Sequence, residues 1–309
     1  MDSLPPRPAP RRPVSRRALL TGAGALTLTT AASPAEAATP AVTLPLIGPA
    51  TGPDVHVMTC NVRYDKAGTR RTSPDYWPRR VPALQDLLRA EQPDLLGTQE
   101  ALDHQLPAIR DALPDTYRML GNGTEGEYSA MFYDAARFTV GEWRQRWISD
   151  TPDVPSPTYG NTLPRIIVWA TLTDTATGRD LLWLNTHLDN VSDESRRRGA
   201  EMMLQVVAEH PGLPVVVTGD VNSAAGDSVA WTTLVTEGGL TDAWSAAQRR
   251  LTPAYGTFTD YRAPRVGGER IDWILVDGAT VLAAAVNTWT RTGQAPSDHA
   301  PVQALIRVP

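Results

Sequence analysis

The chain has 309 residues, of which 41% are apolar and 20% are charged, so it is long enough to bury a sizeable core in one large domain or two. This composition excludes a collagen-like chain, a low-complexity chain and a disulfide scaffold. Because only one residue is cysteine, intrachain disulfides and cysteine-rich metal sites are excluded too. Any metal must therefore bind to oxygen and imidazole, and the net charge of -5 argues weakly against a protein that holds long nucleic acid.

Residues 1–37 have the layout of a secretory signal, because a basic stretch precedes an uncharged run over 18–32 and the small-residue end Ala35-Glu36-Ala37. Within it, the run from Ser15 to Leu20 resembles a twin-arginine export signal. The alternative is a transmembrane anchor, but the run is shorter than the roughly 20 residues that a bilayer span needs. We therefore predict that the protein is exported, is secreted or extracytoplasmic, and has no stable membrane insertion. We also expect it to be a monomer.

Removal of this signal changes the charge of the remaining chain. Residues 1–37 hold five arginines and two acidic residues, so the rest carries 24 basic against 32 acidic residues and a net charge near -8. Residues 38–53 are rich in Ala, Thr, Pro and Gly and are expected to be a flexible leader. The sequence then predicts one domain over residues 54–309.

Short runs rich in β-branched and apolar residues recur along that domain and predict seven or more strands. They lie at residues 55–60, 129–133, 166–170, 181–185, 215–218, 271–276 and 302–306. Apolar residues at helical spacing predict helices over 79–90 and 195–209. Since helices separate only some of the strands, the pattern indicates an α+β or α/β class with a mixed sheet rather than a regular βαβ repeat.

Polar residues stand at the ends of these strands, where side chains from one rim of a sheet converge. Singly, each has an ordinary explanation as a turn residue or a structural histidine, but six such placements favour a functional site. Carboxylates suit Mg²⁺, Mn²⁺ or Ca²⁺, and histidines can relay a proton near neutral pH. The residues concerned are Asn61, Glu100, His187, Asp220, Asn222, Asp272, Asp298 and His299.

In chain order these residues resemble the endonuclease/exonuclease/phosphatase family of the deoxyribonuclease-I-like superfamily, in its secreted bacterial type. The resemblance covers residues 54–308, and its specific motifs are Gly219-Asp220-Val221-Asn222 and Ser297-Asp298-His299. Weaker matches are Thr59-Cys60-Asn61, Gly97-Thr98-Gln99-Glu100, Asn185-Thr186-His187 and Arg270-Ile271-Asp272. The resemblance implies an α+β fold, a four-layer α/β/β/α sandwich of two mixed sheets flanked by helices.

The resemblance also implies a divalent-metal-dependent hydrolysis of a phosphate ester, with Mg²⁺ as the expected cofactor and Mn²⁺ or Ca²⁺ as alternatives. By the family pattern Glu100 is the principal metal ligand, with Asn61 and Asp298 beside it. Asp220 and Asn222 match the pair that orients the attacking water, and His187 matches a histidine at the scissile phosphate. Asp272 matches the carboxylate that supports His299, so either His299 or Asp220 acts as the base, and the sequence leaves this open.

The chain departs from many nuclease members at Arg63, where these have an acidic residue, so a metal ligand there is in doubt; Asp65 is near but offset. Arg165 precedes a strand, and we weigh it equally as a phosphate contact or a surface arginine. Trp143, Trp147 and Tyr159 are expected to pack in the core rather than to form a substrate platform. Cys60 is expected to be an ordinary buried strand residue.

The substrate is expected to be a small or extended organic phosphate, either a diester or a monoester. The mature charge and the lack of a basic cluster beyond Arg196-Arg197-Arg198, expected to be a solvated helix face, disfavour a nucleic acid partner. An extracellular nuclease acting on DNA or RNA is the first alternative. A non-catalytic binding protein on the same fold is the second.

Overall fold

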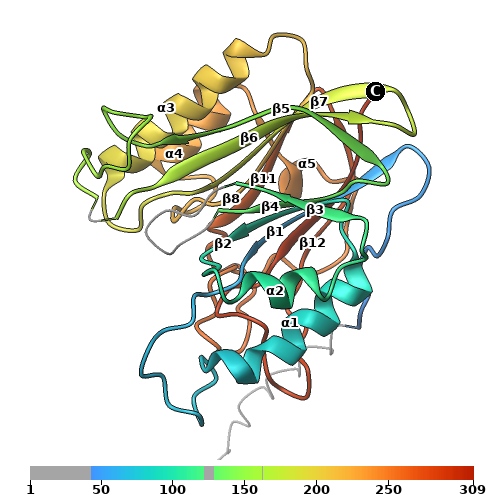
Figure 1. The fold of residues 1–309 in the computed structure, drawn as a ribbon, viewed down its shortest axis with the longest axis vertical. Helices are drawn as coiled ribbons and strands as arrows, with labels where there is room; N and C mark the ends of the chain where they lie inside the picture. The colour runs from blue at the N-terminus through green and yellow to red at the C-terminus, as the bar shows by residue number, and fades with distance from the viewer. Residues whose placement is uncertain (1–42, 122–128, 162) are drawn as a thin grey trace, which may run out of the picture. The chain divides into compact units, whose positions relative to one another are not determined.

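The computed structural model describes residues 43–121, 129–161 and 163–309, and in these ranges two mixed β-sheets form the centre of the molecule (Figure 1). The first sheet has seven strands in the order β10 (Arg249–Arg250), β12 (Thr280–Val286), β13 (Val302–Arg307), β1 (Asp54–Asn61), β2 (Leu95–Gln99), β4 (Met131–Asp134) and β3 (Tyr117–Leu120). The second has six in the order β5 (Phe138–Trp147), β6 (Ile166–Asp174), β7 (Arg179–His187), β8 (Val215–Asp220), β11 (Asp272–Asp277) and β9 (Thr241–Asp242).

Helices cover the outer faces of both sheets, which gives four layers (Figure 1). α1 (Trp77–Glu91) and α2 (Leu106–Arg110) lie on the first sheet, and α3 (Asp193–Glu209) and α4 (Val229–Trp231) lie on the second. One apolar cluster fills the space between the sheets, and one lies under each helical layer. The remaining helical segments are the π-helix η1 (Thr232–Glu237) and α5 (Ala243–Ala246). The predicted four-layer sandwich of two mixed sheets is confirmed.

The two long helices form where the apolar spacing predicts them. In α1, Leu84, Leu87 and Leu88 are buried against the first sheet, and the helix ends at Gln92 in the left-handed conformation. α3 begins after Ser192, whose hydroxyl accepts a hydrogen bond from the backbone N–H of Ser195. The predicted ranges 79–90 and 195–209 are each within two residues of the observed bounds.

The sheets approach closely at Gly97 of β2. A Cβ atom there would lie 2.2 Å from Oγ1 of Thr218 and 2.4 Å from Oδ1 of Asn185, so no larger residue fits without movement. Asn185 and Thr218 belong to a buried polar layer between the sheets, in which the amide of Gln99 donates to Asn185 at 2.9 Å. These contacts fix one sheet against the other directly behind the strand ends that carry the candidate site.

The seven predicted strands are all present, and so is β2, the strand implied by the placement of Glu100 at a strand end. Five strands were not predicted. β5 is long but alternates apolar and charged residues at a sheet edge, β12 is rich in alanine, and β3, β9 and β10 have only two to four residues. Short or weakly apolar strands gain their stability from neighbours that a local pattern does not reveal.

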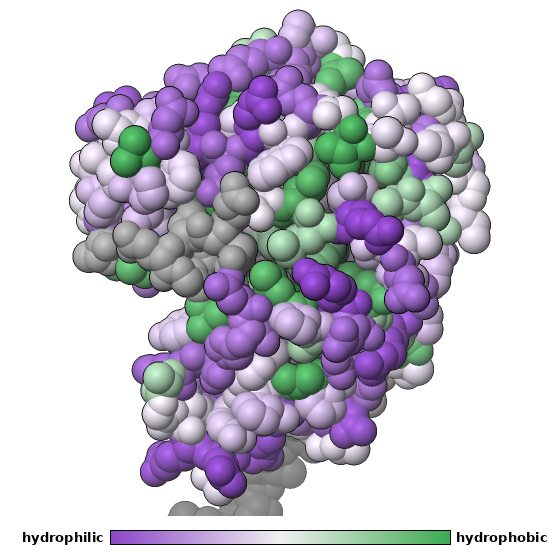
Figure 2. Space-filling view, in the orientation of Figure 1, coloured by the Kyte–Doolittle hydropathy of each residue, from purple (hydrophilic) through white to green (hydrophobic). Residues whose placement is uncertain are grey.

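The expected export signal at residues 1–37 and the first residues of the expected leader lie outside the described residues. Further along the leader, the backbone N–H groups of Leu46, Ile47 and Gly48 donate to the carboxylate of Glu91 in α1. No helix in the described ranges is both long and apolar enough to cross a membrane. The face seen in Figure 2 is largely hydrophilic over both helical layers, and hydrophobic side chains reach the surface mainly in the band between them.

Candidate active site

Polar side chains from both sheets converge on one cavity of about 510 Å³ at the end of the sandwich. β1 and β2 of the first sheet lead into Asn61 and Glu100, and Asp298 and His299 directly precede β13. His187 and Asp220 end β7 and β8 of the second sheet, which pair in parallel, and Asp272 begins β11. The cavity is lined by Arg63, Tyr64, Glu100, Leu163, Arg165, His187, Asn190, Asp220, Asn222, Phe258, Asp260, Ile271, Asp298 and His299.

Asp220 lies at the centre of these contacts and is 1% exposed. Its Oδ2 atom accepts a hydrogen bond from the amide of Asn61 at 2.9 Å, and it lies 3.6 Å from Nε2 of His187 and 3.7 Å from Nε2 of His299. Its Oδ1 atom accepts from the backbone N–H of Asn222 at 2.9 Å. Asp220 therefore contacts both imidazoles, and its hydrogen bond from Asn61 of β1 joins the second sheet to the first.

His299 is held between carboxylates. Its Nδ1 atom lies 2.9 Å from Oδ2 of Asp272, and the side chain is 7% exposed. Burial lowers the pKa of His299, but the charges of Asp272, Asp220 and Asp298 and the hydrogen bond to Asp272 outweigh burial and raise it to about 10. At neutral pH the ring is therefore an imidazolium, able to donate a hydrogen bond from Nε2 into the cavity.

His187 has a different neighbour, Arg165. The guanidinium of Arg165 lies 3.1 Å from Nδ1 of His187 and 3.5 Å from Asp189, and Arg165 is only 5% exposed. A guanidinium can only donate, so this contact requires Nδ1 of His187 to be an acceptor. The interpretation of Arg165 as a surface residue is therefore wrong, since the residue is buried in the wall of the cavity.

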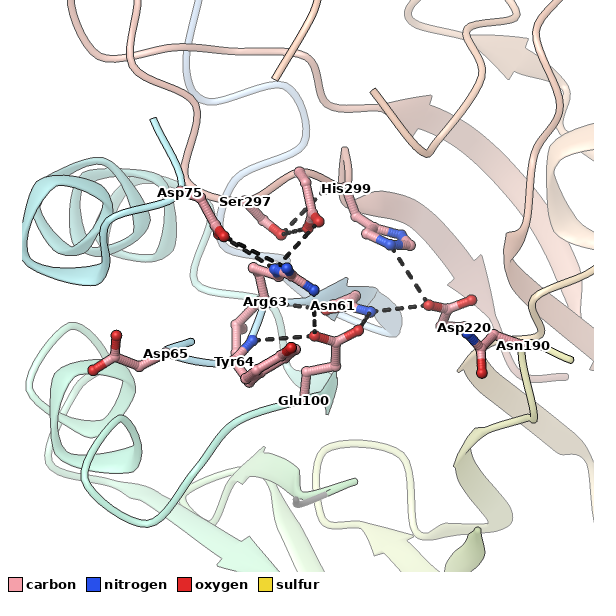
Figure 3. Close-up of polar contacts among 12 residues, drawn as sticks. Asn61, Arg63, Tyr64, Asp65, Asp75, Glu100, Asn190, Asp220, Ser297 and His299 are labelled. Atoms are coloured by element: carbon pink, nitrogen blue, oxygen red, sulfur yellow. Dashed lines mark hydrogen bonds and ion pairs between the residues drawn. The ribbon is translucent and has the colours of Figure 1, made fainter. Parts of the chain in front are cut away.

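Arg63 lies among three carboxylates on the other side of Glu100 (Figure 3). Its guanidinium is 3.2 Å from Asp75, 3.5 Å from Asp298 and 3.7 Å from Glu100. Burial lowers the pKa of Arg63, but the neighbouring carboxylates raise it above its ordinary value. The guanidinium also lies 4.5 Å from the ring centre of Tyr64.

Arg80 of α1 holds the loop that carries Arg63. The Arg80 side chain is fully buried and donates to the backbone carbonyls of Val62, Arg63, Tyr64 and Asp75. A further contact at 3.4 Å reaches the carbonyl of Pro296, next to the segment that carries Asp298 and His299. One guanidinium thus connects two loops of the site through hydrogen bonds to their backbone carbonyls, two of which are buried.

Four cavity-lining residues adopt a left-handed backbone conformation that non-glycine residues rarely use. The φ angles are 57° at Arg63, 68° at Glu100, 49° at Asn222 and 49° at Asp260. Such conformations cost on the order of 1–3 kcal/mol each and persist only where the surroundings enforce them. The surrounding contacts at the cavity therefore hold these residues in backbone conformations that are unfavourable in isolation.

Glu100, His187 and Asp220 form a group whose ligand atoms all lie within 4.8 Å of one another, and a second such group is Asp220, Asp272 and His299. The first group is the better match to a hard divalent ion, because the carboxylates of Glu100 and Asp220 both line the cavity, whereas Asp272 lies behind it and pairs with His299 at 2.9 Å. Asn61 contributes its amide nitrogen here, since its Oδ1 atom accepts from the backbone N–H of Arg63 at 2.9 Å. Its N–H groups hold Glu100 and Asp220 together, at 3.0 and 2.9 Å.

All of the residues predicted from sequence meet in this region, seven lining the cavity and Asn61 and Asp272 buried directly behind it. Asp65 does not replace the missing acidic ligand, because its side chain points away from the cavity and contacts the exposed His104 at 2.9 Å (Figure 3). Trp143 and Trp147 pack on the core between the sheets, as expected, and Tyr159 packs under α3. Arg197 and Arg198 pair with Glu194 and Glu201 on the exposed face of α3.

Sequence reasoning missed the role of Arg80 and the exposed Phe258, whose ring lies 5.1 Å from that of His299. Phe258 is 53% exposed and forms part of the cavity wall. Its position follows from pairing between the backbones of Phe258 and His299, which lie 41 residues apart. The available signal for Arg80 was a charged residue on the apolar face of α1, which is unusual unless the charge is paired.

Two stacked mixed sheets thus bring two histidines, His187 held by Arg165 and His299 paired with Asp272, together with Glu100 and Asp220 at one cavity. The chain belongs to the endonuclease/exonuclease/phosphatase family, whose family model matches residues 58–299. It is thus a phosphate-ester hydrolase of that family.

Among solved structures, the chain is 30% identical to the mannosyl-6-phosphatase of Bacteroides thetaiotaomicron VPI-5482, with a TM-score of 0.75 over 82% of this chain and 99% of that one. An endonuclease/exonuclease/phosphatase protein of Bacteroides vulgatus is 31% identical, with a TM-score of 0.75 over 83% and 99% of the two chains. The human Nocturnin catalytic domain shares the fold at 19% identity, with a TM-score of 0.64 over 84% and 96%. Comparison with curated protein sequences gives no significant match.

Proposed function

We propose that this chain is an exported, divalent-metal-dependent phosphoesterase that hydrolyses a small organic phosphate, with a sugar phosphate monoester as the first candidate. The observation that carries the proposal is the single cavity in which His187, His299, Asp220 and Glu100 face one another. The 30% identity to a mannosyl-6-phosphatase supports the monoester and the sugar. A diester of similar size is the second candidate.

The residues present fit a divalent ion, since the carboxylates of Glu100 and Asp220 offer hard oxygen donors within 4.8 Å of each other. We assign Glu100 as the principal ligand, with Mg²⁺ as the expected ion and Mn²⁺ or Ca²⁺ as alternatives. Asn61 donates to both Glu100 and Asp220 and so fixes the distance between them. Asp298 forms an ion pair with Arg63 and helps to hold that guanidinium beside Glu100. When bound, the ion would offset charge on the phosphoryl oxygens.

The protein's own side chains carry out the other steps of the proposed hydrolysis. His299, kept protonated by Asp272, donates from Nε2 to a phosphoryl oxygen and stabilises the charge that develops in the transition state. Asp220 is then the base that accepts a proton from the attacking water, and Asn222 holds Asp220 in position through its backbone N–H. Arg165 orients His187, which contacts the phosphate from the opposite side.

A substrate panel tests the proposal. We expect hydrolysis of mannose 6-phosphate and other sugar phosphates with Mg²⁺, loss of activity in EDTA, and recovery when Mg²⁺ is restored. Bis(p-nitrophenyl) phosphate, duplex DNA and RNA separate the diester and nuclease alternatives from the monoester. Faster cleavage of DNA or RNA than of every small phosphate would contradict the proposal, as would activity that survives Asp220→Asn.

Export rests on the sequence of residues 1–37, whose basic stretch and uncharged run are typical of a twin-arginine signal. Cell fractionation of the full chain tests it. We expect the protein outside the cytoplasm and shortened at its N-terminus. Replacement of Arg16 and Arg17 by lysine should retain it inside, and unchanged export of that variant would contradict the twin-arginine assignment.

A further inference from the structure

The space between Glu100 and Asp298 is already filled by a positive charge. The guanidinium of Arg63 lies 3.7 Å from Oε2 of Glu100 and 3.5 Å from Oδ2 of Asp298. The same Oε2 atom accepts a hydrogen bond from the backbone N–H of Tyr64 at 3.1 Å. Glu100 therefore presents its other oxygen, Oε1, toward the amide of Asn61 and the Asp220 side of the cavity (Figure 3).

Arg63 is held firmly in this position. Its Nε and Nη2 atoms contact the two carboxylate oxygens of Asp75 at 3.2 and 3.5 Å. The buried Arg80 donates to its backbone carbonyl at 3.0 Å, and its ring contact with Tyr64 covers one face of the guanidinium. A side chain fixed at both ends cannot swing away without breaking several of these contacts at once.

The guanidinium of Arg63 offsets only part of the negative charge around it. Asp75, Glu100 and Asp298 carry three negative charges around Arg63, which remains positive at every physiological pH. A divalent ion placed between Glu100 and Asp298 would meet the guanidinium at short range in a half-buried region, where like charges repel strongly. On the Asp220 side it would meet the carboxylates of Glu100 and Asp220 instead.

We propose that Arg63 takes the cation position between Glu100 and Asp298, so that this chain binds a single divalent ion and binds it on the Asp220 side of Glu100. The inference rests on the metal dependence proposed above. It assigns Asp298 to the positioning of Arg63 rather than to the ion, and it makes Arg63 a positioning residue of the metal centre.

Binding of Mn²⁺ to the full chain, measured by equilibrium dialysis and by electron paramagnetic resonance, tests the location of the ion. The wild-type protein is expected to bind one ion. Glu100→Gln and Asp220→Asn should each weaken binding at least tenfold, whereas Asp298→Asn should weaken it less than threefold. A loss in Asp298→Asn equal to that in Asp220→Asn overturns the inference.

The number of ions tests the role of Arg63. Arg63→Gln removes the charge and is expected to admit a second Mn²⁺ ion, seen as two bound equivalents and as spin–spin broadening of the resonance. Arg63→Lys keeps the charge and should keep one equivalent. Two ions on the wild-type protein, or one ion with unchanged affinity in Arg63→Gln, overturn the inference but leave metal dependence standing. No Mn²⁺ binding by the wild-type protein overturns both proposals, and the comparison of Asp298→Asn with Asp220→Asn remains decisive even if Arg63→Gln does not fold.

Discussion

The two halves of the site neutralise their carboxylates in different ways. In the arginine half, Arg63 lies among Asp75, Glu100 and Asp298, and its charge is the same at every pH at which the protein folds. In the histidine half, His299 lies between Asp272 and Asp220, and its charge depends on a proton. The comparison teaches that Arg63 gives one half of the site a fixed positive charge, whereas the positive charge of the other half can change with pH.

Replacement of His299, whose charge depends on a proton, should have the largest effect on catalytic activity. We expect His299→Gln to lower kcat/KM for a sugar phosphate by about 10³-fold, because it removes a charged donor aimed at the phosphoryl group. Steady-state kinetics with Mg²⁺ check this. His104→Gln is the matched control, since His104 is exposed and lies outside the cavity, and it should change kcat/KM less than twofold. Similar losses of kcat/KM in His299→Gln and His104→Gln would contradict the role given to His299.

Gly97→Ala should disturb the close approach of the two sheets, which holds both halves of the site together. The added Cβ would lie 2.2 Å from Thr218, so we expect the free energy of unfolding to fall by about 3 kcal/mol. Urea denaturation measures the change. In the double variant with Thr218→Ala, part of the loss should be recovered, because the second substitution makes room. Strictly additive effects would show that the sheets do not meet as described.

The pH response should separate the halves. The folded pKa of His299, about 10, lies above the ordinary value of 6.5, so the stability that His299 contributes is complete below pH 6.5 and is lost as pH rises through 10. In Asp272→Asn the titration midpoint of His299 should fall by at least 2 pH units, equivalent to about 2.7 kcal/mol. The imidazole proton resonances, followed between pH 5 and 11, check this. An unchanged midpoint would contradict the role given to Asp272.

Arg80→Met should affect the arginine half most. It removes five hydrogen bonds to backbone carbonyls, two of them buried, so we expect the free energy of unfolding to fall by about 2 kcal/mol. Thermal unfolding measures this loss, and the His299 titration in the same variant measures whether the histidine half has changed. Arg79→Met, on the adjacent and exposed position of α1, is the control. A shifted His299 titration midpoint would show that the halves are coupled.

Much of the fold followed from local patterns, because the strongly apolar strands and the two long helices each carry their own signal. β5 and β12 did not, since an edge strand with charged residues and a run of alanines are stabilised mainly by strands distant in sequence. The site residues could be predicted because they stand at strand ends in the order of a known family. Their partners could not be predicted in the same way. Arg80 reaches Pro296 across 216 residues, and no spacing in the sequence encodes such a contact.

The contacts of Arg63 could not be predicted from the sequence either. The sequence showed only that Arg63 stands where many nuclease members have an acidic residue. The structure shows what stands in place of that carboxylate, a guanidinium shared by three acidic residues. A departure from a family pattern can therefore be an informative position, but its meaning depends on neighbours that only the folded chain brings together.

The buried carboxylate of Glu91 has a consequence for where the chain can be shortened. It accepts three backbone N–H groups from residues 46–48 and a further hydrogen bond from the amide of Asn287. A protein that starts after residue 37 keeps all of these donors. One that starts at residue 54 leaves a fully buried carboxylate with the Asn287 amide alone among these four donors, so the folded body begins about eight residues before its first strand.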